Sequence, residues 1–163
     1  MTIVEFVRVF LHDAPVGVVV TNADLTRPGP TILYANPAFG QLTGRDPNDL
    51  VGQSPRFMQG KETRRTALDA FHRALAGGDR FQGYLTNYRA DGTKYRVELD
   101  CRPCQDPLGK VFAFIAFERE VTRRLGRPAS GQAGRYEPAD LSNDSFTGAL
   151  RELGVFSAEY NVS

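Results

Sequence analysis

The sequence holds one pair of side chains whose spacing is typical of redox or metal chemistry, Cys101 and Cys104. A C-x-x-C pair in a reducing compartment is either a redox pair or half of a zinc site. Zinc needs two further ligands, and neither His12 nor His72 lies at metal-ligand spacing from the cysteines. A redox pair is expected at a helix N-terminus, whereas this pair ends a strand-like run. The pattern therefore favours small pocket or core residues over a redox or zinc site.

No other set of side chains predicts a catalytic site. The sequence has no Ser-His-Asp or Cys-His arrangement and no phosphate-binding loop. Its net charge of +1 gives no field that favours nucleic acid or an anionic membrane. The apolar runs Val16–Val20 and Val111–Phe117 are far shorter than the roughly 20 residues that span a bilayer. We therefore expect a cytoplasmic protein that is not an enzyme and has no nucleic-acid or membrane partner.

The hydrophobic periodicity changes along the chain from mixed helix and strand to strand alone. A first helix is expected over residues 2–12, and short helices are expected to begin at Asn36-Pro37 and Asp46-Pro47, where an N-cap precedes a proline. A longer helix is expected to open at Thr63. The expected strands are 16–21, 31–35, 81–89, 93–101 and 110–121, with a hairpin turn at Asp91-Gly92. This order predicts an α+β fold, a five-stranded antiparallel sheet with short helices on one face.

The segment Gly52–Gly60 resembles the signature of LOV domains, the flavin-binding branch of the PAS superfamily, usually G-x-N-C-R-F-L-Q-G. Further segments resemble the family motifs N-x-A-F, N-Y-R-K-D-G and F-I-G in a matching register, namely Asn36–Phe39, Asn87–Gly92 and Phe114–Ala116. The resemblance covers roughly residues 16–122 and implies the PAS fold.

Two positions of the signature depart from the family pattern. Ser54 stands where the family has asparagine, and Pro55 stands where it has the cysteine that forms a light-driven thioether with flavin. Proline has no thiol. The resemblance therefore implies a LOV-like domain that does not form this photoadduct.

The resemblance also implies a flavin mononucleotide (FMN) site. Arg56 matches an arginine that pairs with the flavin phosphate, and Gln59 matches a residue that contacts the ribityl chain. Asn87 matches the first of two ring-binding asparagines, whereas Val97 stands at the second and Glu118 at a ring-binding glutamine. The residues expected to bind the phosphate and the ribityl chain mostly match the family pattern, whereas those expected to bind the ring mostly do not.

These residues are compatible with two states of the pocket. It either binds FMN, or it is empty or has been repurposed. Each hydrogen bond lost to the ring weakens binding by about 1–3 kcal/mol. A protonated Glu118 replaces glutamine better than an ionised one, and burial raises the pKa of a carboxyl group. The expected apolar lining consists of Val20, Leu85, Val97, Leu99, Cys101 and Phe114.

The chain is expected to comprise an N-terminal helix (1–15), a PAS/LOV-like domain (16–122), a linker (123–141) and a C-terminal tail (142–163). The start of the linker is rich in Arg, Gly, Ser and Pro, as flexible linkers are. The tail carries apolar residues at helical spacing, which predict one short helix that docks on the domain or on a partner: Phe146, Leu150, Leu153 and Phe156.

The leading interpretation is a stand-alone sensory or regulatory protein that signals through contacts with an unidentified protein partner. Two alternatives remain, a flavin-free interaction or dimerisation module and a sensor of another small ligand held by Arg56. The apolar stripe of the N-terminal helix predicts a two-fold homodimer through this helix and the sheet: Val4, Val7, Phe10 and Leu11.

Overall fold

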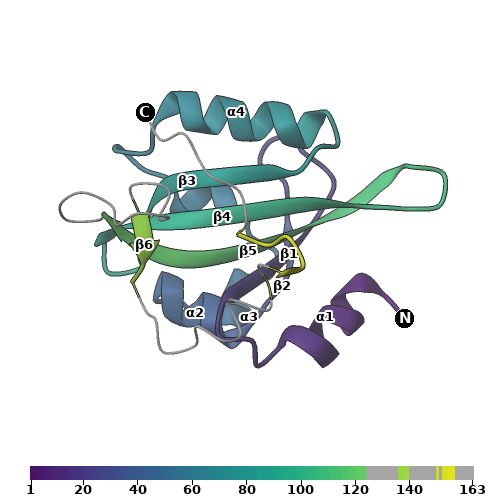
Figure 1. Ribbon diagram of the computed structural model, residues 1–163, viewed down its shortest axis with the longest axis horizontal. Helices are drawn as coiled ribbons and strands as arrows, with labels where there is room; N and C mark the ends of the chain where they lie inside the picture. Colours follow the sequence, from purple (N-terminus) through teal and green to yellow (C-terminus); the bar gives the residue numbers. More distant parts are fainter. Residues whose placement is uncertain (124–135, 140–149, 151, 157–163) are drawn as a thin grey trace.

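An antiparallel sheet in the order β2-β1-β5-β4-β3 forms the centre of the molecule, and β6 pairs with the end of β5 (Figure 1). The computed structural model describes residues 1–123, 136–139, 150 and 152–156. The strands are β1 (Gly17–Asn22), β2 (Ile32–Ala35), β3 (Phe81–Tyr88), β4 (Lys94–Gln105), β5 (Val111–Arg123) and β6 (Tyr136–Pro138). The predicted α+β layout is confirmed, with a sixth strand added.

The helices pack on both faces of this sheet. One face, called here the inner face, is covered by α2 (Pro37–Thr43), α3 (Pro47–Leu50), the 3-10 turn η1 (Pro55–Met58) and α4 (Arg65–Ala76). Helix α1 (Ile3–Leu11) lies on the opposite, outer face. Successive strand residues point to opposite faces, so Val19 packs in the inner core while Val18 and Val20 pack in the outer one.

The side chain of Asn36 explains where α2 begins. It is fully buried and accepts hydrogen bonds from the backbone N–H groups of Phe39 (3.0 Å) and Val18 (2.8 Å). Its amide donates to the carbonyl of Val16 (3.0 Å), so one residue ties the helix to β1. Asp46 caps α3 in the predicted way.

Helix α4 begins two residues later than the sequence predicts. The hydroxyl of Thr63 accepts from the N–H of Gly60 (2.9 Å) and donates to the carbonyl of Thr86 (2.7 Å). These contacts tie the loop to β3, and the helix starts at Arg65 without a side-chain cap.

Strand β4 runs past Cys101 to Gln105, so both cysteines lie inside the strand rather than at its end. Their side chains point to opposite faces, because Cys101 packs in the inner core and Cys104 packs against the outer one. Both thiols are free. The interpretation of the pair as pocket and core residues is confirmed. Among the described residues, no group of three His, Cys, Asp or Glu side chains is arranged to hold a metal ion.

The region expected to be a linker contains a strand. Residues Tyr136–Pro138 form β6, which pairs with β5 through Val121, Thr122 and Arg123. No pattern in the sequence predicts this strand, because three residues are too few to show a periodicity.

The described part of the tail docks on the outer face of the sheet. Leu150, Val155 and Phe156 are buried in the outer core, but Leu153 is 75% exposed, so the predicted stripe is wrong at Leu153. Phe146, the first residue of that stripe, lies outside the described residues.

The predicted apolar stripe of α1 divides between the core and the surface. Val7 is buried, and Val4 and Leu11 pack against the outer core. Phe10 is 65% exposed and lies beside Phe6, with ring centroids 4.9 Å apart. Separately, none of the helices in the described part of the chain combines the length and the apolar character needed to span a membrane.

Candidate functional site

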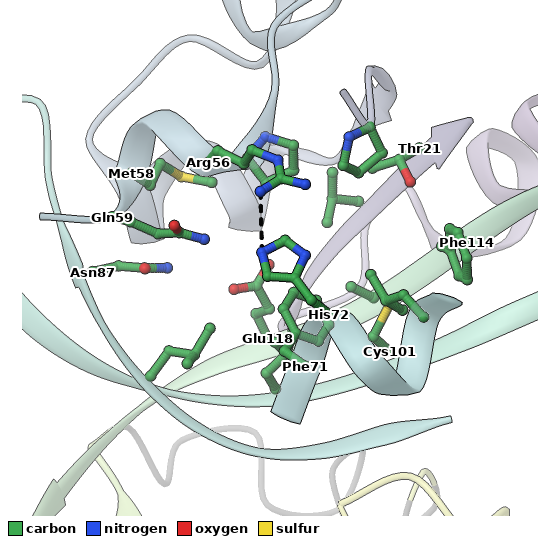
Figure 2. Close-up of a pocket in the computed structure, with 17 residues that line it drawn as sticks. Thr21, Arg56, Met58, Gln59, Phe71, His72, Asn87, Cys101, Phe114 and Glu118 are labelled. Atoms are coloured by element: carbon green, nitrogen blue, oxygen red, sulfur yellow. Dashed lines mark hydrogen bonds between the residues drawn. The ribbon is translucent and has the colours of Figure 1, made fainter. Parts of the chain in front are cut away.

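A pocket lies between the inner face of the sheet, η1 and α4 (Figure 2). The space open to the centres of water-sized molecules is about 60 Å³, enough for several waters at roughly 10–15 Å³ each. Most of its wall is apolar: Val19, Pro30, Pro55, Met58, Phe71, Leu75, Leu85, Leu99, Cys101, Phe114 and Ala116. The polar lining residues are Thr21, Arg56, Gln59, His72, Asn87 and Glu118.

Strand register brings these side chains together. Across β1, β5 and β4, Val19 pairs with Ala116, which pairs with Cys101. One step along the same face, Glu118 lies between Gly17 and Leu99. Alternate residues of a strand share a face, so the three central strands present one continuous wall to the pocket.

Arg56 is fixed at the mouth of the pocket by three contacts. Its Nε donates to the carbonyl of Gly29 (2.6 Å), and its Nη2 donates to the carbonyl of Leu25 (3.3 Å). Its Nη1 donates to Nε2 of His72 on α4, 3.0 Å away. The guanidinium therefore joins the β1–β2 loop to α4.

His72 accepts this bond as a neutral ring. Burial, then the charges of Arg56 and Arg27, lower the pKa of His72 below its ordinary value of 6.5. Burial also lowers the pKa of Arg56, with Arg27 adding to the effect. A guanidinium remains charged at pH 7 even so.

The mouth opens into a basic depression on the surface. Arg56, Gln59 and His72 line both the pocket and this depression. The other residues of the depression are Leu25, Arg27, Arg65, Leu68 and Asp69. Three arginines against one aspartate give this end of the site a positive potential that attracts anions.

Polar groups also meet at the inner end of the pocket. Figure 2 shows Gln59, Asn87 and Glu118 extending into the same space. Glu118 is 6% exposed, and burial raises the pKa of its carboxyl group to about 8. Burial likewise raises the pKa of the Cys101 thiol, with the charge of Glu118 adding to the effect. The thiol is therefore protonated at pH 7 and a poor nucleophile.

The structure brings together most of the residues that the resemblance predicted. Those that line the pocket are Arg56, Gln59, Asn87, Glu118, Pro55, Leu99 and Phe114. Ser54 does not line it, since its hydroxyl caps η1 by accepting from the N–H of Arg56 (3.3 Å). Val97 is fully buried in the inner core and does not line the cavity.

Sequence reasoning placed one pocket residue on the wrong face and missed several others. Val20 points to the outer core, and its neighbours Val19 and Thr21 line the pocket instead. Alternation along β1 could have shown which residues face the pocket. Because Val18, Val19 and Val20 are all valine, however, the sequence does not distinguish the two faces of this strand. Met58 comes from η1, and Phe71 and Leu75 come from the apolar face of α4, where helical periodicity does not distinguish a pocket wall from a core.

Comparison with known proteins matches residues 15–123 to the sequence family described as "PAS domain". The bacterioopsin transcriptional activator of Halobacterium salinarum is 31% identical over 143 residues, covering 88% of this chain and 21% of the relative. Phototropin-2 of Oryza sativa subsp. japonica is 38% identical over 101 residues, covering 62% of this chain and 11% of the relative. The chain thus spans about a fifth or less of these curated relatives.

Solved structures give the same result for the fold. An RNA-binding light-oxygen-voltage receptor matches with a TM-score of 0.64 and 29% identity, covering 71% of this chain and 32% of that chain. The LOV domain of a blue-light activated histidine kinase from Erythrobacter litoralis matches with a TM-score of 0.60 and 26% identity, covering 65% and 95%.

Proposed function

This chain belongs to the PAS domain family, and on that premise we propose that it is a sensory or regulatory module that binds FMN in the inner pocket. LOV domains among the structural relatives support this choice of ligand. The proposal further holds that the module does not form a cysteinyl photoadduct, because Pro55 lies in the pocket wall where the family has its reactive cysteine.

One observation carries the proposal, the continuity of an apolar pocket with a basic mouth. FMN joins a flat ring to an anionic phosphate through a flexible chain. The ring suits the apolar wall, and the phosphate suits the depression around Arg56, Arg27 and Arg65. Gln59 lines both parts and is placed to contact the chain between them.

The inner end of the pocket fits a flavin ring through fewer groups than the family uses. Asn87 offers an amide, and Glu118 offers a carboxyl that has no hydrogen bond or ion pair within the part of the chain that the structure describes. A buried polar group without a partner is satisfied when a ligand supplies one. Bound FMN would supply absorption of blue light, and the role of these residues is to orient its ring and exclude water.

Titration of the purified protein with FMN and with riboflavin tests the proposal. We expect FMN to bind more tightly than riboflavin, since only FMN carries the phosphate. Arg56→Ala should remove most of this preference, by about 1.5–3 kcal/mol or roughly 10- to 150-fold. Arg73→Ala is the matched control, because Arg73 lies next to His72 on α4 but is exposed and outside the pocket. Failure of both flavins to bind would contradict the proposal.

A second candidate function, a flavin-free interaction module, is favoured by the exposed apolar face of α1. Phe6, Val9 and Phe10 are 47%, 65% and 65% exposed. In both cases we propose that the protein forms a homodimer and acts on a protein partner. Release of the docked C-terminal segment, residues 150 and 152–156, is the proposed output.

A further inference from the structure

Glu118 is a buried acid that the proposed binding of FMN does not by itself explain. It lies on β5, the middle strand of the sheet, between Gly17 of β1 and Leu99 of β4. Its side chain lines the pocket and is 94% buried, from an exposed fraction of 6%. No hydrogen bond or ion pair reaches its carboxyl from any residue described in the structure.

The elements packed around Glu118 bring no free cation to it. Strand β1 contributes Gly17, Val19 and Thr21, and α2 has no ionisable residue. On β4, the pocket-side groups Tyr95 and Cys101 are neutral at pH 7, since burial raises the pKa of each.

The charged groups on the same side already have partners. Glu120, two residues along β5, forms an ion pair with Arg89 (2.8 Å). At the mouth, Arg56 binds two backbone carbonyls and His72. Desolvation is therefore the cause that raises the pKa of Glu118, to about 8.

The two protonation states of such a group differ in what they offer a ligand. A neutral carboxylic acid donates one hydrogen bond and accepts others, whereas a carboxylate only accepts. The edge of a flavin ring carries carbonyl oxygens and ring nitrogens that accept hydrogen bonds. A carboxylate facing such acceptors is repelled and remains unsatisfied, which is costly in an apolar site.

We propose that Glu118 stands in the pocket as a neutral carboxylic acid that donates a hydrogen bond to an acceptor on the ring edge of the ligand, and that its ionisation releases the ligand. The identity of the ligand rests on the proposed function, but the state of Glu118 does not. Occupancy of the pocket thereby becomes sensitive to pH in the mildly alkaline range.

Proton linkage sets the size of the effect. If only the neutral form binds, the apparent dissociation constant is inversely proportional to the neutral fraction, so it rises about tenfold for each pH unit above the pKa of the free protein. Between pH 7 and pH 9 we therefore expect FMN to bind roughly tenfold more weakly. The phosphate of FMN stays dianionic throughout this range, since its second pKa is about 6.

The experiment measures FMN binding at pH 7, 8 and 9 for the full chain, for Glu118→Gln and for Glu137→Gln. The glutamine at position 118 keeps the shape and a donor but cannot ionise, so its affinity should not change with pH. Glu137 is exposed on β6 and serves as the matched control, which should follow the wild type. Infrared spectra of the ligand-free protein follow the carbonyl band of a protonated acid over the same range.

The outcomes separate this inference from the proposed function. Binding that weakens with pH in the wild type but not in Glu118→Gln supports the inference. Equal pH dependence in both proteins overturns it while FMN binding stands. If FMN binds neither protein at any pH, the proposed function fails. The infrared titration then tests the protonation state of Glu118 on its own. An acid band that disappears between pH 7 and 9 and is absent from Glu118→Gln then upholds the state of Glu118, and a carboxylate already ionised at pH 7 overturns it.

Discussion

Position 55 decides which photochemistry the pocket supports. Pro55 lines the cavity and carries no thiol, so illumination of the FMN-loaded protein should not exchange the blue absorption band for a near-ultraviolet adduct band. Absorption spectra before and after blue light check this expectation, with Pro55→Cys as the companion variant. A reversible adduct in the wild type would contradict it. The next test would then be Cys101→Ala, because the Cys101 thiol also lines the pocket.

Burial of Glu118 also predicts how stability depends on pH. Its pKa rises from an ordinary 4.5 to about 8 in the folded protein, so between these values the folded state keeps a proton that the unfolded state loses. The contribution of Glu118 to stability is complete below pH 4.5 and is lost as pH rises toward 8. The maximal slope is about 1.4 kcal/mol per pH unit.

Urea unfolding of the ligand-free protein at pH 5, 6, 7 and 8 measures this slope. We expect the stability of Glu118→Gln, relative to wild type, to increase steadily over the series. Glu137→Gln, which alters an exposed carboxyl, should run parallel to wild type. Parallel curves for Glu118→Gln and wild type would show that Glu118 is already ionised in the folded protein.

Single residues also show how far the pocket was predictable from sequence. Arg56, Gln59 and Asn87 follow from matched motifs, and the structure places all three at the cavity. Val97 stands at the position of a ring-binding asparagine in the family, but its side chain is buried in the inner core and does not line the cavity. A motif fixes which face a strand residue points to, whereas the packing of neighbouring helices fixes whether that face is cavity or core.

At the scale of elements, the predictable helices are those with caps in the sequence. Asn36-Pro37 and Asp46-Pro47 mark the starts of α2 and α3, because an N-cap side chain and a proline both act within one turn. Strand β6 was not predictable in this way, and for the C-terminal segment the sequence predicts docking but not the surface on which it docks. Their positions depend on pairing and burial against β5 and the outer face, which are long-range contacts.

The C-terminal segment is held on the outer face by a buried charge as well as by apolar contacts. Asp100 is fully buried and receives hydrogen bonds from Arg80 (3.0 and 2.6 Å) and from the N–H of Phe156 (3.1 Å). Arg80 also donates to the carbonyl of Gly154. The guanidinium of Arg119 lies 4.5 Å from the centroid of the Phe156 ring. The carboxylate of Asp100 therefore joins Arg80 to the C-terminal segment.

We expect Asp100→Asn to weaken this docking, because it removes the charge that joins Arg80 and Phe156. Losing one partner of a buried ion pair costs about 3–5 kcal/mol, less here because Arg80 is partly exposed. Hydrogen exchange of residues 150 and 152–156 should accelerate, while exchange in β1 stays slow. Asp79→Asn, an exposed change near Arg80 in sequence, is the control. Unchanged protection in Asp100→Asn would contradict the role of the carboxylate.

The same contact predicts an acid-sensitive attachment. Burial alone would raise the pKa of Asp100, but hydrogen bonds from Arg80, Phe156 and Gln82 outweigh it and lower the pKa below its ordinary 3.8. A lowered pKa stabilises the docked state above 3.8, and this stabilisation is lost as pH falls through the folded value. Limited proteolysis of the tail should therefore be unchanged from pH 8 to 5 and increase only in stronger acid. Release already at pH 6 would point to a different group.

At the scale of the whole molecule, the sheet separates the inner pocket from the outer face, on which the described C-terminal residues lie. Glu118 faces the pocket, while its neighbours Phe117 and Arg119 face the outer side, where Arg119 contacts Phe156. Asp100 likewise lies between the pocket residues Leu99 and Cys101. Strands β4 and β5 therefore carry pocket residues and residues that contact the C-terminal segment in direct succession, a direct covalent link between the proposed ligand site and the proposed output.

The exposed face of α1 predicts how whole molecules associate. Phe6, Val9 and Phe10 form an apolar surface of α1 that stays exposed, whereas Val7 is buried against the sheet. We expect a two-fold homodimer that buries this face, measured as a dimeric mass by light scattering at tens of micromolar. Phe10→Ser should shift the mass toward the monomer without lowering the melting temperature, because Phe10 contributes little to the core. Leu108→Ser is the matched control, since Leu108 is 95% exposed in the β4–β5 turn, and it should remain dimeric. A monomeric wild type at that concentration would contradict the dimer, and a dimer insensitive to Phe10→Ser would place the interface on another surface.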